Sequence, residues 1–89
     1  MNQEINDFLN ANLEQLKKIY DEGIKENQDG LLLVNYLKQQ EKVDVMFLNT
    51  NKVNEIITEE GWKEMKEKAR GHRICLVNND GNIVVVHLN

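Results

Sequence analysis

The sequence predicts a two-layer α+β domain, in which helices pack on a mainly antiparallel sheet that ends in a C-terminal β-hairpin. Three observations favour this class: a helical apolar pattern at the start of the chain, short runs rich in Val and Leu, and two β-rich runs joined by Asn79-Asp80-Gly81. We expect the elements in the order αββαββ, with residues 1–89 forming a single domain.

The composition is that of an ordinary globular protein, with 40% hydrophobic and 29% charged residues. No apolar run approaches the roughly 18 residues that a membrane span needs. The first residues, Met1 to Glu4, lack the basic start and apolar stretch of a secretion signal. Cys75 is the single cysteine, which fits a reducing compartment. We therefore expect a cytoplasmic protein with no membrane partner.

The first segment, about residues 3–27, is predicted to be an amphipathic helix with Asn2 as a candidate N-cap. Such a helix is roughly 37 Å long, whereas a seven-residue strand spans only about 23 Å. The helix therefore either overhangs the sheet and meets another chain, or breaks near Gly23. Its apolar stripe consists of Ile5, Phe8, Leu9, Leu13, Leu16, Ile19, Tyr20 and Ile24.

Two apolar runs follow this helix. Residues 43–48 read as a strand, with Val43, Val45 and Phe47 on one face. Residues 31–37 are ambiguous between a buried strand and a buried helix, because short continuous apolar runs suit both. We prefer the strand, and the helix would change the order of elements to ααβαββ.

A faint internal repeat supports that preference. The segment Leu32-Leu33-Val34-Asn35 is similar to Cys75-Leu76-Val77-Asn78, and residues 43–49 are similar to residues 83–89 in ending with Leu-Asn. Two tandem helix–strand–strand units would explain both similarities.

The C-terminal half begins with a helical region, residues 52–69, which is expected in one piece or two, with Thr58 as the cap of the second. The hairpin follows, and its register is open by one residue. A two-residue turn at Asp80-Gly81 places Ile74 opposite His87, whereas a turn with a bulge at Gly81 places Arg73 there.

The strands carry apolar residues at both parities, although a sheet covered on one side should alternate apolar and polar residues. Either a second chain covers the other face, or the helices divide between the two faces, or residues 31–37 are themselves a covering helix. We expect the first, which makes a homodimer or a complex with another protein. The predicted protein-interface residues are Leu32, Val34, Tyr36, Met46, Leu48, Val84, Val86 and Leu88.

The net charge of −4 belongs to the N-terminal half, because residues 1–44 hold nine acidic and five basic side chains while residues 45–89 hold six of each. This argues against nucleic acid there, since phosphate binding draws on Lys and Arg. The candidate nucleic-acid contacts are the basic residues of the C-terminal half, Lys63, Lys66, Arg70 and Arg73.

Catalytic and metal-binding motifs are weak. The chain has no Ser, so Cys75 with His72 or His87 is the one nucleophile–base pair to consider. A cysteine flanked by Ile74 and Leu76 is more typical of a buried hydrophobe. The same three residues fall short of a zinc site, because His72 and Cys75 point to opposite sides of a straight strand. We expect no metal, no cofactor and no enzyme.

Three functional hypotheses follow, in order of preference. The first is a small acidic protein-binding module, such as a regulator, an inhibitor or a phage-encoded or immunity-type protein, that acts as a homodimer or on a protein partner of unknown identity. The second is a nucleic-acid-binding regulator that uses the basic residues between Lys63 and Arg73. The third is a small enzyme or ligand sensor built around Cys75, His72 and His87.

Overall fold

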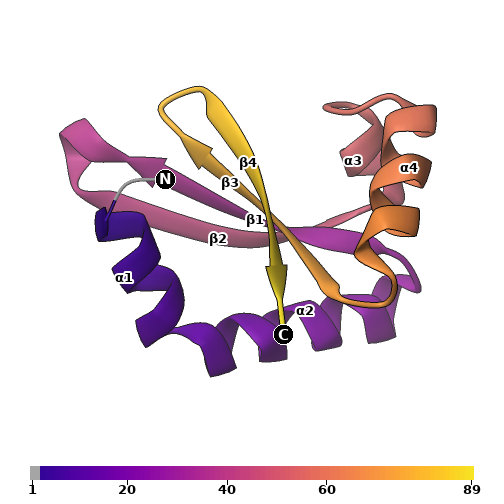
Figure 1. Ribbon diagram of the computed structural model, residues 1–89, viewed down its shortest axis with the longest axis horizontal. Helices are drawn as coiled ribbons and strands as arrows, with labels where there is room; N and C mark the ends of the chain where they lie inside the picture. The colour runs from indigo at the N-terminus through magenta and orange to yellow at the C-terminus, as the bar shows by residue number, and fades with distance from the viewer. Residues whose placement is uncertain (1–2) are drawn as a thin grey trace.

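In the computed structural model the chain folds into a four-stranded mixed sheet with helices on both faces (Figure 1). The structure describes residues 3–89. The candidate N-cap Asn2 lies outside the described residues. In chain order the elements are α1 (Gln3–Ala11), α2 (Leu13–Asn27), β1 (Gly30–Leu37), the 3-10 helix η1 (Lys38–Gln40), β2 (Lys42–Asn49), α3 (Thr50–Asn54), α4 (Glu59–Ala69), β3 (Arg73–Asn79) and β4 (Asn82–Leu88).

The strand order is β2-β1-β3-β4, with β1 and β3 parallel at the centre and each antiparallel to its outer neighbour. This confirms the α+β class and the αββαββ order, in which each helical region consists of two consecutive helices. Residues 31–37 belong to β1, so the preferred strand is confirmed over the alternative helix.

The helices divide between the two faces of the sheet, so the expected two layers become three (Figure 1). Alternate residues of β1 point to opposite faces: Leu32 and Val34 pack with α1 and α2, and Leu31 packs with α3 and α4. The apolar residues at both parities therefore reflect two cores in one chain. The core beneath α1 and α2 contains Ile5, Leu9, Leu16, Cys75, Val77 and Leu88, and the other contains Leu48, Val53, Trp62, Ala69, Ile74 and Leu76.

The two similar segments of the predicted repeat lie side by side. Leu32 pairs with Cys75, and Asn35 pairs with Asn78, in the parallel register of β1 and β3. The helices of the two helix–strand–strand units lie on opposite faces, so a half-turn about an axis along the strands would be needed to superimpose one unit on the other. Such a half-turn exchanges the two faces of the sheet, whereas Leu32 and Cys75 are paired and point to the same face. The similarity between the two segments therefore does not arise from twofold symmetry of the units.

The N-terminal helical region breaks at Asn12 and not near Gly23. The Asn12 side-chain Nδ2 donates to the Phe8 carbonyl at 2.9 Å, and the Asn12 backbone N–H donates to the same oxygen at 3.0 Å. Side-chain bonds of this kind compete with regular helix geometry. The break turns α1 relative to α2, so that both helices follow the sheet and neither overhangs it (Figure 1).

Gly23 serves a different purpose from the predicted break, because it lies inside α2 and is buried. A Cβ atom at this position would come within 2.2 Å of the Phe47 ring. The ring also meets Tyr20 edge to face, with centroids 6.1 Å apart. A residue without a side chain therefore lets α2 approach β2 closely.

The hairpin has the two-residue turn. Ile74 lies opposite His87, and Asn79 opposite Asn82, so the register without a bulge is confirmed. Asp80 and Gly81 both have positive φ angles, 50° and 94°, as a type I′ turn requires. The Gly81 backbone N–H also donates to the Asn78 side-chain oxygen at 2.9 Å, which holds the turn in place.

We predict that Gly23→Ala destabilises the fold by about 1–3 kcal/mol, because the added methyl group overlaps the Phe47 ring. In an open helix the same change would stabilise by up to about 1 kcal/mol. Urea unfolding measures the difference, with Glu22→Ala on the exposed side of α2 as the control. Adding Phe47→Leu should reduce the cost of Gly23→Ala, and a stabilised single variant would contradict the close approach.

Candidate functional site

The structure buries most of the predicted interface residues within the chain itself. Five of them lie in the two cores, where the chain's own helices cover them: Leu32, Val34, Tyr36, Leu48 and Leu88. Val86 is half-buried, while Met46 and Val84 are 44% and 39% exposed. The predicted set is therefore not one surface.

A different apolar surface lies on the α3/α4 side of the sheet. The short helices α3 and α4 cover one end of this side, and the other end has no helix above it (Figure 1). One row crosses all strands here, from Met46 through Leu33 and Leu76 to Val85. The side chains of this uncovered part, which we call the open face, are Leu37, Met46, Ile83 and Val85. Leu33 packs against the core beneath α3 and α4 and lies at the border of the open face.

A groove borders the open face between α4 and β4. Its volume is about 420 Å³, and it is lined by Gly61, Glu64, Met65, Lys68, Val85 and His87. Gly61 contributes no side chain, and its N–H donates to the capping Thr58 hydroxyl at 3.0 Å. The groove therefore has Val85 and His87 of β4 on one side and α4 on the other.

Polar groups around the open face pair with one another. The Asn78 amide donates to the Asn35 side-chain oxygen at 3.1 Å across the central strands. Lys68 forms an ion pair with Glu64 at 3.0 Å beside the groove, and Lys42 lies 3.7 Å from Asp44 on β2. The charges bordering this surface therefore compensate each other.

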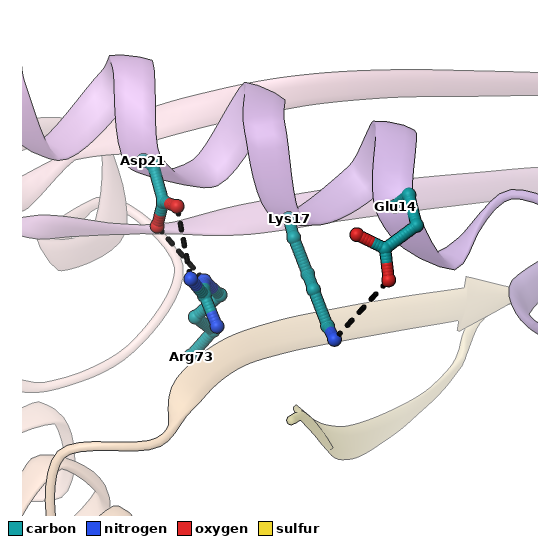
Figure 2. Close-up of polar contacts among 4 residues, drawn as sticks. All are labelled: Glu14, Lys17, Asp21 and Arg73. Carbon is teal, nitrogen blue, oxygen red and sulfur yellow. Dashed lines mark hydrogen bonds and ion pairs between the residues drawn. The ribbon is translucent and has the colours of Figure 1, made fainter.

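The basic residues proposed for nucleic acid do not form one free stripe. Lys66 contacts Asp29 at 2.8 Å and lies 5.1 Å from the centre of the Trp62 ring. Arg73 makes two parallel bonds to the Asp21 carboxylate, at 2.8 and 2.9 Å (Figure 2). These carboxylates occupy the groups that would otherwise meet phosphate. Lys63 and Arg70 are exposed.

The Arg73–Asp21 contact links β3 to α2 (Figure 2). Its hydrogen bonds hold the pKa of the Asp21 carboxyl below the ordinary value for aspartate and raise the pKa of the Arg73 guanidinium. On the same helix Lys17 lies 3.5 Å from Glu14 (Figure 2). The hydrogen bonds between Arg73 and Asp21 therefore attach α2 to β3.

Cys75 does not meet the two histidines of the predicted Cys–His site. Cys75 is buried with the α1/α2 core, and burial raises the pKa of its thiol to about 12. His87 points to the opposite face, where its ring stacks on His72 with centroids 5.7 Å apart. The His72 Nδ1 also contacts the Asn89 side-chain oxygen. Among residues 3–89 no three His, Cys, Asp or Glu side chains gather to hold a metal ion.

Sequence reasoning missed Leu37, Ile83 and Val85, which share the open face with the predicted Met46. From the last strand it selected Val84, Val86 and Leu88, which alternate with Ile83 and Val85 and point to the opposite face of the sheet. Strand periodicity separates the two sets but cannot tell which one the helices cover.

No protein family, curated protein or solved structure matches this chain. None of the helices within residues 3–89 is long and apolar enough to cross a membrane.

We predict that Asp21→Asn lowers thermal stability at pH 7 but has no effect in strong acid. The lowered pKa means that the native state favours the ionised carboxylate, so this stabilisation is present above the unfolded pKa of about 3.9 and disappears as the pH falls through the native value. Thermal midpoints of both proteins between neutral and acidic pH measure the effect, and a constant difference at all pH values would contradict it.

A second prediction concerns Cys75. Its buried thiol should react with a maleimide only when the protein unfolds, because the thiolate is the nucleophile and burial disfavours it. Labelling followed by mass spectrometry, with and without denaturant, measures this. The matched control is Ile56→Cys, whose thiol at a 49% exposed position should react in the native state. Rapid native labelling of Cys75 would revive the enzyme hypothesis.

Proposed function

We propose that this chain is a small protein-binding module, a regulator or inhibitor without catalytic activity, which contacts its partner through the open face and the adjoining groove. The observation that carries the proposal is the row of apolar side chains on a sheet surface whose other end is covered by helices. Ile83, Met46 and Val85 are 52%, 44% and 42% exposed on this surface.

Burial of such side chains is favourable by roughly 25 cal/mol per Å² of apolar area. Monomeric proteins rarely expose a large contiguous apolar patch unless it has a partner. The residues of the open face come from β1, β2 and β4, so the open face is a contiguous surface of the sheet and not a single exposed side chain. This supports contact with another protein surface.

The surroundings of the open face also suit a protein interface. Such interfaces have an apolar centre and a polar rim that pairs its charges. Met46 and Met65 supply adaptable side chains on the open face and in the groove wall. The rim consists of the Glu64–Lys68 and Lys42–Asp44 pairs.

Most acidic residues of the N-terminal half lie away from the open face. Acidic residues such as Glu14, Asp21 and Glu22 are on α2, across the sheet from the open face. Together α1 and α2 hold six acidic and three basic side chains, a balance of −3, which favours solubility without adding repulsion at the apolar surface.

We predict that Met46→Lys weakens partner binding. Tagged protein would capture partners from a lysate of the native host, and quantitative mass spectrometry would identify them. The complex would then be reconstituted from purified components. A charge on the open face should weaken a reconstituted complex by about tenfold or more, because the lysine must be desolvated. The matched control is Asn10→Lys, which adds the same charge at an exposed site on α1.

Equal stoichiometric capture by both variants would contradict the proposed surface. A chain that recovers no stoichiometric partner and does not associate with itself at any accessible concentration would contradict the function. Thermal unfolding of Met46→Lys confirms that the loss is not due to misfolding, since the native side chain is 44% exposed.

A further inference from the structure

The outer edge of β4 has no neighbouring strand within residues 3–89. The strand order leaves β2 and β4 as the two edges of the sheet. Asn79 and Asn82 flank the two-residue turn and bond to each other, so the residues of β4 alternate between bonding to β3 and pointing outward. The outward N–H and C=O groups belong to Ile83, Val85 and His87.

The two edges differ in charge. The β2 edge carries Lys42 and Asp44, and charged side chains are a common device against edge-to-edge pairing. The segment Asn82–Leu88 contains no Asp, Glu, Lys, Arg or Pro. Its first four residues are exposed. An uncharged, apolar and exposed edge of this length is a template for another strand.

We propose that the strand which pairs with this edge is β4 of a second copy of this chain, antiparallel about a twofold axis at Val85. Val85 then lies opposite Val85 of the second copy, and Ile83 lies opposite His87 of the second copy, because these residues carry the outward backbone groups. The pairing joins two four-stranded sheets into one continuous sheet. The inference rests on the proposed function, in that the open face serves as a protein interface.

The chemistry of β4 favours its own copy. On one face the register brings Val84 against Val86 of the second copy, and on the other it brings Val85 against itself, so β-branched residues meet across the new pair. No ionic side chain of β4 faces a like charge, so the net charge of −4 does not oppose the contact locally. An isologous contact of this kind closes on itself and forms a dimer.

The pairing also completes the groove. Val85 and His87 line the groove beside α4, and in the dimer they lie at or next to the axis. The groove of each copy therefore meets that of the other there, and one composite site forms between the two copies of α4. Seven residues a side are fewer than the roughly 20–30 of a standard interface, so the strand pair alone makes a weak dimer.

The test is cross-linking at single cysteines introduced into the full chain, with the buried native Cys75 left in place. Val85→Cys should form a disulfide dimer on mild oxidation. Ile83→Cys alone should not, but a mixture of Ile83→Cys and His87→Cys should yield the mixed dimer. Asp44→Cys on the other edge is the control. Sedimentation equilibrium of the unmodified chain should show a monomer–dimer equilibrium.

A strictly monomeric chain without cross-linking at Val85 would overturn the second copy as occupant, as would equal cross-linking at Asp44 or Ile83. Neither result affects the Met46→Lys capture experiment, so failure of the dimer and failure of the proposed function are separable. A backbone variant adds an independent arm: Val85→Pro removes an outward N–H and should give a folded monomer, whereas Val84→Pro removes a bond to β3 and should disrupt the hairpin.

Discussion

The parallel pairing of β1 with β3 is the constraint on which the rest of the structure depends. Parallel neighbours cannot be joined by a tight turn, so the chain must travel through β2, α3 and α4 before β3 begins. That connection carries α3 and α4 to the face opposite α1 and α2. Both central strands are thereby buried on two sides, and Leu31, Leu32, Leu76 and Val77 are at most 1% exposed.

The placement of the helices leaves part of the sheet uncovered. On one face α1 and α2, with 9 and 15 residues, together follow the sheet. On the other face α3 and α4, with 5 and 11 residues, gather at one end of the sheet (Figure 1). The open face lies beyond these two helices, and its apolar residues are of the kind that a covering helix would normally bury.

The predictable features are those with local causes. The turn at Asp80-Gly81 follows from the conformations those two residues tolerate, and β1 follows from its apolar content and its similarity to β3. The position of the helix break depends on partners distant in sequence: Gly23 looks like a helix breaker until Phe47 is placed against it. The choice between the parities of β4 likewise requires knowing which face each helix pair takes, and strand periodicity carries no such information.

The two edges of the sheet have complementary roles in the proposed dimer. Pairing of β4 with β4 uses up the uncharged edge of each copy and leaves β2 at both ends of the joined sheet. There Lys42 and Asp44 lie on the remaining edges, where charge opposes further strand addition. Pairing of β4 with β2 would instead be heterologous and would extend without limit. The distribution of charge between the edges thus favours a closed pair over a fibre, because the edge that lacks protection is the one that a second copy covers.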